Sequence, residues 1–137
     1  MRPISLLFNL FLLLFIFSCS ESKDCCVANP LTITWVAASV DVENRLYTST
    51  NEILMTLQEE GQMSIKLDIN TCGGDYLMDL SAQTITFKEM FCTEACCDSE
   101  FAQNIVDVLQ RSDRFETSGN VLTIFAGDDK ANFLPKE

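Results

Sequence analysis

The feature that most constrains the fold is a single segment whose apolar residues recur at helical spacing. The segments around it show the alternation that is typical of β-strands. The helical stripe consists of apolar residues spaced at i, i+4, i+7 and i+8: Phe101, Ile105, Val108 and Leu109. Between residues 63 and 69, by contrast, apolar and polar side chains alternate, which buries one face of a strand and wets the other. We therefore expect one helix in a chain built mostly of strands.

Further strands are predicted from short β-branched and aromatic runs that lie between turn residues. We expect strands at 31–36, 53–57, 63–69, 76–80, 84–87, 114–117, 121–125 and 132–134, with a loop at 37–51. The paired glycines after Cys72 predict a tight bend, and Asp98 or Ser99 is suited to cap the helix. Because no strand–helix–strand repeat occurs, the order predicts an α+β fold, in which a small curved, barrel-like antiparallel sheet packs on one α-helix.

The first 18 residues have the composition of an export signal. Arg2 is the only charged side chain before Glu21, and an almost wholly apolar run extends from Ile4 to Phe17. As a helix this run would rise about 21 Å, which is short of the roughly 30 Å hydrocarbon core of a membrane. A positive start, a short apolar run and then small residues are typical of a secretory signal.

The end of this signal, Ile16-Phe17-Ser18-Cys19, resembles the bacterial lipobox. The resemblance implies cleavage before Cys19 and several acyl chains on Cys19, and two or more chains anchor a protein stably in a membrane. Ser20 at the second mature position is similar to the signal for passage to the cell outer membrane. We expect residues 19–30 to form a tether and residues 31–137 to form the domain, which faces either the periplasm or the outside.

The charge and composition exclude several classes of function. The chain has no His, so a His-based triad and His-liganded zinc or iron are excluded. Its net charge is −11. Loss of residues 1–18 removes Arg2 and brings the mature charge to −12. This charge disfavours nucleic acid as a partner, because binding to the phosphate backbone depends on basic patches. It also disfavours contact with anionic lipid headgroups, so the acyl chains on Cys19 are the expected membrane contact.

Six cysteines remain if Cys19 is lipidated: Cys25, Cys26, Cys72, Cys92, Cys96 and Cys97. An even number in an exported chain indicates disulfides, with fifteen possible pairings. Neighbouring Cα atoms lie about 3.8 Å apart, closer than is usual in a disulfide, so adjacent cysteines are expected to take different partners. We expect the tether cysteines to join the N-terminal strand to segment 92–97. Cys72 is expected to pair with Cys96 or Cys97.

Two functional interpretations compete with structural disulfides. Cys92 and Cys96 have the spacing of a zinc-ligand pair, but Cys72 has no partner at that spacing. A redox site needs a low-pKa thiol beside a cation, whereas Glu94 and Asp98 lie next to the clustered cysteines. Structural disulfides are therefore the favoured interpretation, and we expect neither a metal nor a cofactor.

Several motifs in a fixed order resemble the META domain family, also called HslJ-like, of bacterial exported and lipid-anchored proteins. They are Trp35 near the first strand, the turn at Cys72 that leads to Gly74-Asp75-Tyr76, the segment from Thr93 to Cys97, and Gly119-Asn120-Val121-Leu122 after the helix. The match covers roughly residues 31–135, with Thr71 and Gly73 in place of the usual Gly and Asn. The resemblance implies a small antiparallel barrel wrapped around one helix, an association with the cell envelope and stress response, and no established catalytic activity.

The sequence offers no catalytic constellation, so we do not expect an enzyme. The favoured function is a non-enzymatic envelope lipoprotein that acts through contacts with an envelope protein or peptidoglycan. In the alternative, Trp35 and Tyr76 line a small-ligand or peptide site at the barrel mouth, although aromatic residues on short strands are more often core. A third possibility is thiol-based redox chemistry or zinc binding by Cys92, Cys96 and Cys97.

Overall fold

The computed structural model describes residues 29–48 and 50–137. The predicted export signal, the lipidation site Cys19 and the tether cysteines Cys25 and Cys26 lie outside the described residues. Within the described ranges the elements follow one another as β1 (Thr34–Val42), β2 (Arg45–Tyr47), β3 (Leu54–Leu57), β4 (Gln62–Lys66), β5 (Thr71–Asp79), β6 (Thr84–Cys92), α2 (Glu100–Arg111), β7 (Arg114–Ser118), β8 (Val121–Ala126) and β9 (Asp129–Pro135).

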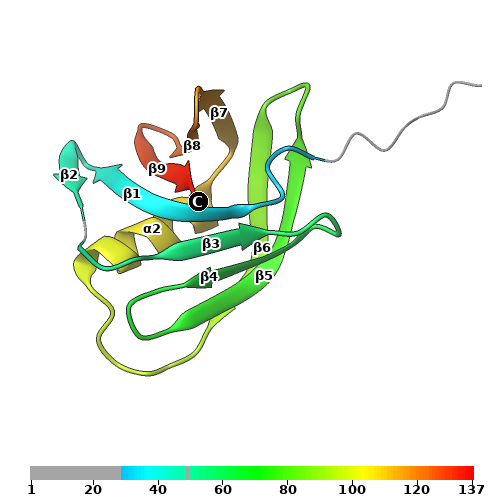
Figure 1. Ribbon diagram of the computed structural model, residues 1–137. Helices are drawn as coiled ribbons and strands as arrows, with labels where there is room; N and C mark the ends of the chain where they lie inside the picture. The colour runs from blue at the N-terminus through cyan, green and yellow to red at the C-terminus, as the bar shows by residue number, and fades with distance from the viewer. Residues whose placement is uncertain (1–28, 49) are drawn as a thin grey trace, which may run out of the picture.

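Eight of the strands close into an antiparallel barrel (Figure 1). Strands β3 to β9 pair in chain order, and β1 pairs with β3 on one edge and β9 on the other. The short strand β2 pairs with the end of β1, where Val42 lies opposite Arg45. For the described residues, the predicted fold of a curved antiparallel sheet packed on one helix is confirmed.

The barrel is joined least extensively between β6 and β7, where the connection carries the helix. These two strands pair at Thr84 and Arg114 alone, and further contact comes from a 2.9 Å hydrogen bond that the Phe115 amide donates to the Gln83 carbonyl. Helix α2 packs against β1, β6, β8 and β9, so it covers the region next to this weak seam.

Helix α2 has both the N-cap and the buried apolar face that its sequence predicts. Ser99 is the N-cap, and its hydroxyl oxygen accepts a 3.2 Å hydrogen bond from the Ala102 amide. The buried residues of the helix are the predicted stripe together with one small residue: Phe101, Ala102, Ile105, Val108 and Leu109. This face joins the barrel core, which explains why one helix is stable among the strands.

Two local predictions were wrong. The segment 37–51 is not a loop, because β1 continues to Val42 with Val40 fully buried and then turns into β2. The turn residues Glu43 and Asn44 both have positive φ, 52° and 61°, as two-residue hairpin turns require. The second error is the bend after Cys72: Gly73 and Gly74 lie inside β5.

Candidate functional site

The two aromatic residues that the alternative hypothesis places at a barrel-mouth site lie in the core. Trp35 and Tyr76 are each 5% exposed. The Trp35 indole Nε1 donates a 3.0 Å hydrogen bond to the carbonyl of Leu31, which satisfies the polar end of the ring. Neither ring lines the two cavities described below. Their position supports a packing role.

Tyr76 also holds the β3–β4 turn in place. Its hydroxyl donates a 2.7 Å hydrogen bond to the carbonyl of Gln58, and its amide donates one of 2.7 Å to the carbonyl of Gly61. Burial raises the pKa of the Tyr76 hydroxyl, and the negative charge of Glu59 raises it further. The phenol therefore stays protonated and keeps its donor role.

Cys72 and Cys92 form a disulfide between the adjacent strands β5 and β6. This finding corrects the expected link from Cys72 to Cys96 or Cys97. The two residues are directly opposite in the strand register, and Cys72 is fully buried. Because Cys72 and Cys92 bond each other, they are not available as zinc ligands or as a redox pair in this state.

Cys96 and Cys97 are exposed and form no disulfide with any described residue. Cys97 has a φ of 90°, which is unusual for a residue with a side chain. The pKa of its thiol is raised, first by a hydrogen bond with Cys96, then by burial and by the negative charge of Asp98. A raised pKa is the opposite of what a thiolate nucleophile needs. The expected link of Cys96 or Cys97 to the tether stays a prediction.

The segment that carries these thiols is held down by Asn70. The Asn70 side chain accepts hydrogen bonds of 2.8 Å from the Thr93 hydroxyl and the Ala95 amide, and its Nδ2 donates to the Ala95 carbonyl and to Asp98. Asp98 in turn accepts from the amides of Ile69 and Asn70. Residues 93–98 therefore dock on the β4–β5 turn, immediately before the helix.

A bulge in β6 turns one large apolar side chain outward. Gly73 lies opposite Phe91 and Asp75 lies opposite Lys88, so the stretch between these pairs is one residue longer in β6 than in β5. Glu89 sits in this bulge with a φ of 50°. Since the extra residue reverses the alternation of faces, Phe91 points outward and is 72% exposed.

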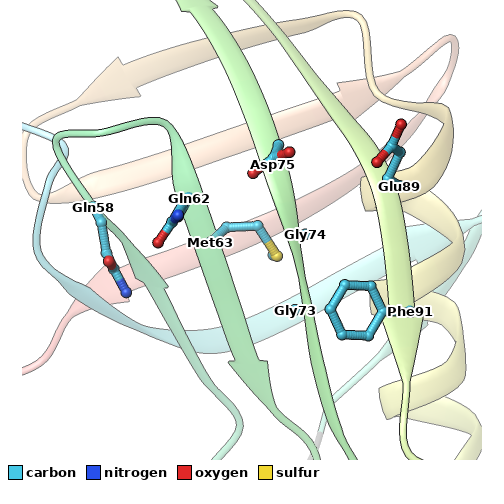
Figure 2. Close-up of a pocket in the computed structure, with 8 residues that line it drawn as sticks. All are labelled: Gln58, Gln62, Met63, Gly73, Gly74, Asp75, Glu89 and Phe91. Carbon is cyan, nitrogen blue, oxygen red and sulfur yellow. The ribbon is translucent and has the colours of Figure 1, made fainter.

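The exposed ring borders a cavity of about 320 Å³ on the β3–β6 side of the barrel (Figure 2). Its lining comes from the β3–β4 turn and from three neighbouring strands: Gln58, Gln62, Met63, Gly73, Gly74, Asp75, Glu89 and Phe91. Gly73 lies under the Phe91 ring, because a Cβ at Gly73 would stand 3.6 Å from the ring's Cζ atom. Two carboxylates, two amides and one aromatic ring therefore share one hollow.

The two carboxylates of this cavity have no ion-pair partner among residues 29–48 and 50–137. The ion pairs in that part of the chain are elsewhere: Arg111 with Asp107 and Asp129, Arg114 with Glu116, and Lys136 with Glu52. Asp75 and Glu89 are both exposed at the rim. The hollow is thus negatively charged and open to a ligand.

A second cavity, of about 250 Å³, lies between the helix and the end of β6. Its lining includes Cys92, Asp98, Val106 and Gln110. In the described part of the chain, no group of three or more Cys, Asp or Glu side chains is placed to hold a metal ion. No helix in that part is long and apolar enough to cross a membrane.

Comparisons with known proteins agree with this architecture. Residues 29–137 match the protein family described as META domain. No curated protein matches the chain.

Among solved structures, a protein from Burkholderia xenovorans determined by NMR is similar with a TM-score of 0.62 and 16% identity, over 77% of this chain and 82% of that one. A DUF4847 family protein from Bacteroides vulgatus is similar with a TM-score of 0.58 and 10% identity, over 78% and 96% of the two chains. At these identities the similarity shows the fold alone.

Proposed function

Because the chain belongs to the META domain family, we propose that it is a non-enzymatic cell-envelope lipoprotein whose barrel binds another envelope protein. The observation that carries the binding role is the exposed ring of Phe91 beside a cavity of about 320 Å³. Aromatic side chains are enriched at the centres of protein interfaces relative to the rest of the protein surface.

The rigidity of the surroundings supports a preformed binding surface. Gln58 belongs to the turn that Tyr76 fixes with two hydrogen bonds of 2.7 Å. The disulfide between Cys72 and Cys92 joins the two strands next to Phe91. A surface that is already ordered loses little conformational entropy when a partner binds, which favours affinity.

The anchored part of the proposal rests on the sequence around Cys19, and it is tested separately from binding. Intact mass of the full chain purified from its native membrane should show a diacyl or triacyl adduct. Cys19→Ser should lose this adduct and leave the membrane fraction. An unmodified Cys19 in the wild-type chain would contradict the anchor.

The binding surface is tested by placing the photo-cross-linker p-benzoylphenylalanine at position 91 of the full chain in cells. The matched control has the same group at position 46, where Leu46 is 68% exposed on β2. We expect one discrete protein adduct from position 91 and none from position 46. Equal labelling at both positions would contradict a binding surface at Phe91.

A small ligand in the same cavity is the second candidate. The cavity volume of about 320 Å³ lies at the lower end of the range for small-molecule pockets. A hollow of this size can enclose a small ligand, whereas a flat surface cannot. If a small ligand rather than a protein occupies the hollow, cross-linking from position 91 yields a mass increase of a few hundred daltons instead of a protein adduct.

A further inference from the structure

We propose that the cavity beside Phe91 receives a cationic side chain of the bound protein, a lysine ammonium or an arginine guanidinium. The inference rests on the proposed binding function and adds to it the chemical class of the group that is bound. The observations that carry it are the charge of the cavity, the exposed aromatic face and the fixed geometry of the lining.

The charge of the lining selects for a cation. Asp75 and Glu89 come from the neighbouring strands β5 and β6, and Figure 2 shows both side chains near the same end of the hollow, with the Phe91 ring farther along β6. The amide oxygens of Gln58 and Gln62, which also line the cavity, can accept hydrogen bonds from N–H groups. Lys88 lies opposite Asp75 in the strand register, but it does not line the cavity and forms no ion pair with a described residue.

The aromatic ring adds a second attraction for a cation. A cation within about 6 Å of a ring centroid is attracted by the negative face of the ring. The domain already contains one such pair, because the Arg114 guanidinium lies 3.6 Å from the centroid of the Phe125 ring. At Phe91 no described arginine occupies the equivalent position, and the ring is 72% exposed.

Other ligand classes fit this cavity poorly. A phosphate or carboxylate would meet Asp75 and Glu89 and the net charge of −11, and would be repelled. A purely apolar group would take water from these carboxylates without giving them a partner, which disfavours its binding. A long, flexible cationic side chain satisfies the carboxylates and lays its methylene stem on the ring.

The inference is tested by binding two tripeptides to the full chain in detergent micelles, followed by NMR of the ¹⁵N-labelled protein. The peptides are Ac-Ala-Arg-Ala-NH₂ and the same peptide with citrulline, which has the shape of arginine but no charge. We expect the arginine peptide to shift the amide signals of residues 73–75 and 89–91 and to bind about tenfold more tightly than the citrulline peptide.

Two variants of the chain give the controls. Asp75→Asn with Glu89→Gln should weaken binding of the arginine peptide about tenfold. Asp128→Asn removes one carboxylate from an exposed turn away from the cavity and should leave binding unchanged. Retained amide signals outside the cavity in the double variant show that it is folded.

Equal binding of the two peptides, or arginine binding that the double variant retains, would overturn the cationic assignment. The two proposals fail separately. One outcome is that position 91 still cross-links a protein at the wild-type level in the Asp75→Asn, Glu89→Gln variant. This result would support the binding surface and contradict the cationic side chain. If position 91 of the wild-type chain forms no adduct, the proposed function itself fails.

Discussion

A Cβ atom on Gly74 would lie 2.9 Å from the carbonyl oxygen of Lys88, closer than side chains approach backbone in folded proteins. The same atom would lie 3.1 Å from the Cα of Met90. Both neighbours belong to the backbone of the β6 bulge, so neither can move as the end of a flexible side chain would. The bulge and Gly74 therefore require each other.

Gly74→Ala is expected to lower the free energy of unfolding by about 2 kcal/mol or more, because the backbone of β5 or β6 must shift. Gly73→Ala is the matched control, since its Cβ would make an ordinary 3.6 Å contact with the Phe91 ring. We expect the control to change stability by less than about 1 kcal/mol. Urea unfolding measures both, and equal loss in the two variants would refute the role of the bulge.

Removal of the disulfide by Cys72→Ala with Cys92→Ala is expected to lower the free energy of unfolding by about 3 kcal/mol. The disulfide closes a loop with a sequence separation of 20 residues, and loop closure restricts the unfolded chain by roughly this amount. The matched control is Cys96→Ser with Cys97→Ser, and unfolding is followed with and without a reductant. A control that costs as much as the test pair would show that Cys96 and Cys97 also form bonds that stabilise the fold.

The fold is expected to lose stability in acid through Asp98. Burial raises the pKa of this carboxyl, but hydrogen bonds from the Asn70 side chain and from the amides of Ile69 and Asn70 outweigh burial, so the net pKa is lowered from 3.8. A group whose folded pKa is lowered stabilises the fold above its unfolded pKa, and this contribution disappears as the pH falls through the folded value.

Urea unfolding at pH 7, 5 and 3 measures this contribution. The wild-type chain is expected to keep it at pH 7 and 5 and to lose it progressively below pH 4. Asp98→Asn should be less stable at pH 7 and should show a smaller further loss at pH 3. Asp128→Asn serves as the control and should follow the wild-type pH dependence. If the stability of Asp98→Asn falls with pH in parallel with that of the wild-type chain, Asp98 is not a cause of the loss of stability in acid.

Ser99→Ala is expected to cost about 1–2 kcal/mol of stability, because the helix loses its N-cap. The Ser99 hydroxyl accepts from the Ala102 amide and also donates to the carboxylate of Asp68, so both bonds disappear. Ser118→Ala at an exposed position of β7 is the control. Thermal unfolding followed by far-UV circular dichroism measures the difference, and Ser99→Asn, which keeps a capping oxygen, should recover part of it.

The sequence was informative where side-chain period and local propensity agree. The stripe from Phe101 to Leu109 and the cap at Ser99 lead directly to helix α2, since burial and capping act within a few residues. The hairpin of β7 and β8 around Gly119 follows for the same reason, because a residue with a φ of 58° suits glycine.

The site was not predictable, because it depends on the register between β5 and β6. Simple alternation from buried Phe87 places Phe91 inside, and only the extra residue at Glu89 turns the ring outward. The same shift brings Cys92 opposite Cys72, which the cysteine spacing could not reveal. The paired glycines predict a bend because glycine allows unusual φ angles, whereas glycine is needed at position 74 because the backbone of β6 approaches closely.

The pairing of β1 with β9 also governs how a growing chain can fold. The amide of Lys136 donates a 2.9 Å hydrogen bond to the carbonyl of Thr34, about one hundred residues earlier in synthesis. Contacts between such distant positions form slowly, and the first strand keeps one edge unpaired until the last strand is complete. A chain that stops before Asp129 exposes edges on both β1 and β8, at which incomplete molecules can add to one another and aggregate.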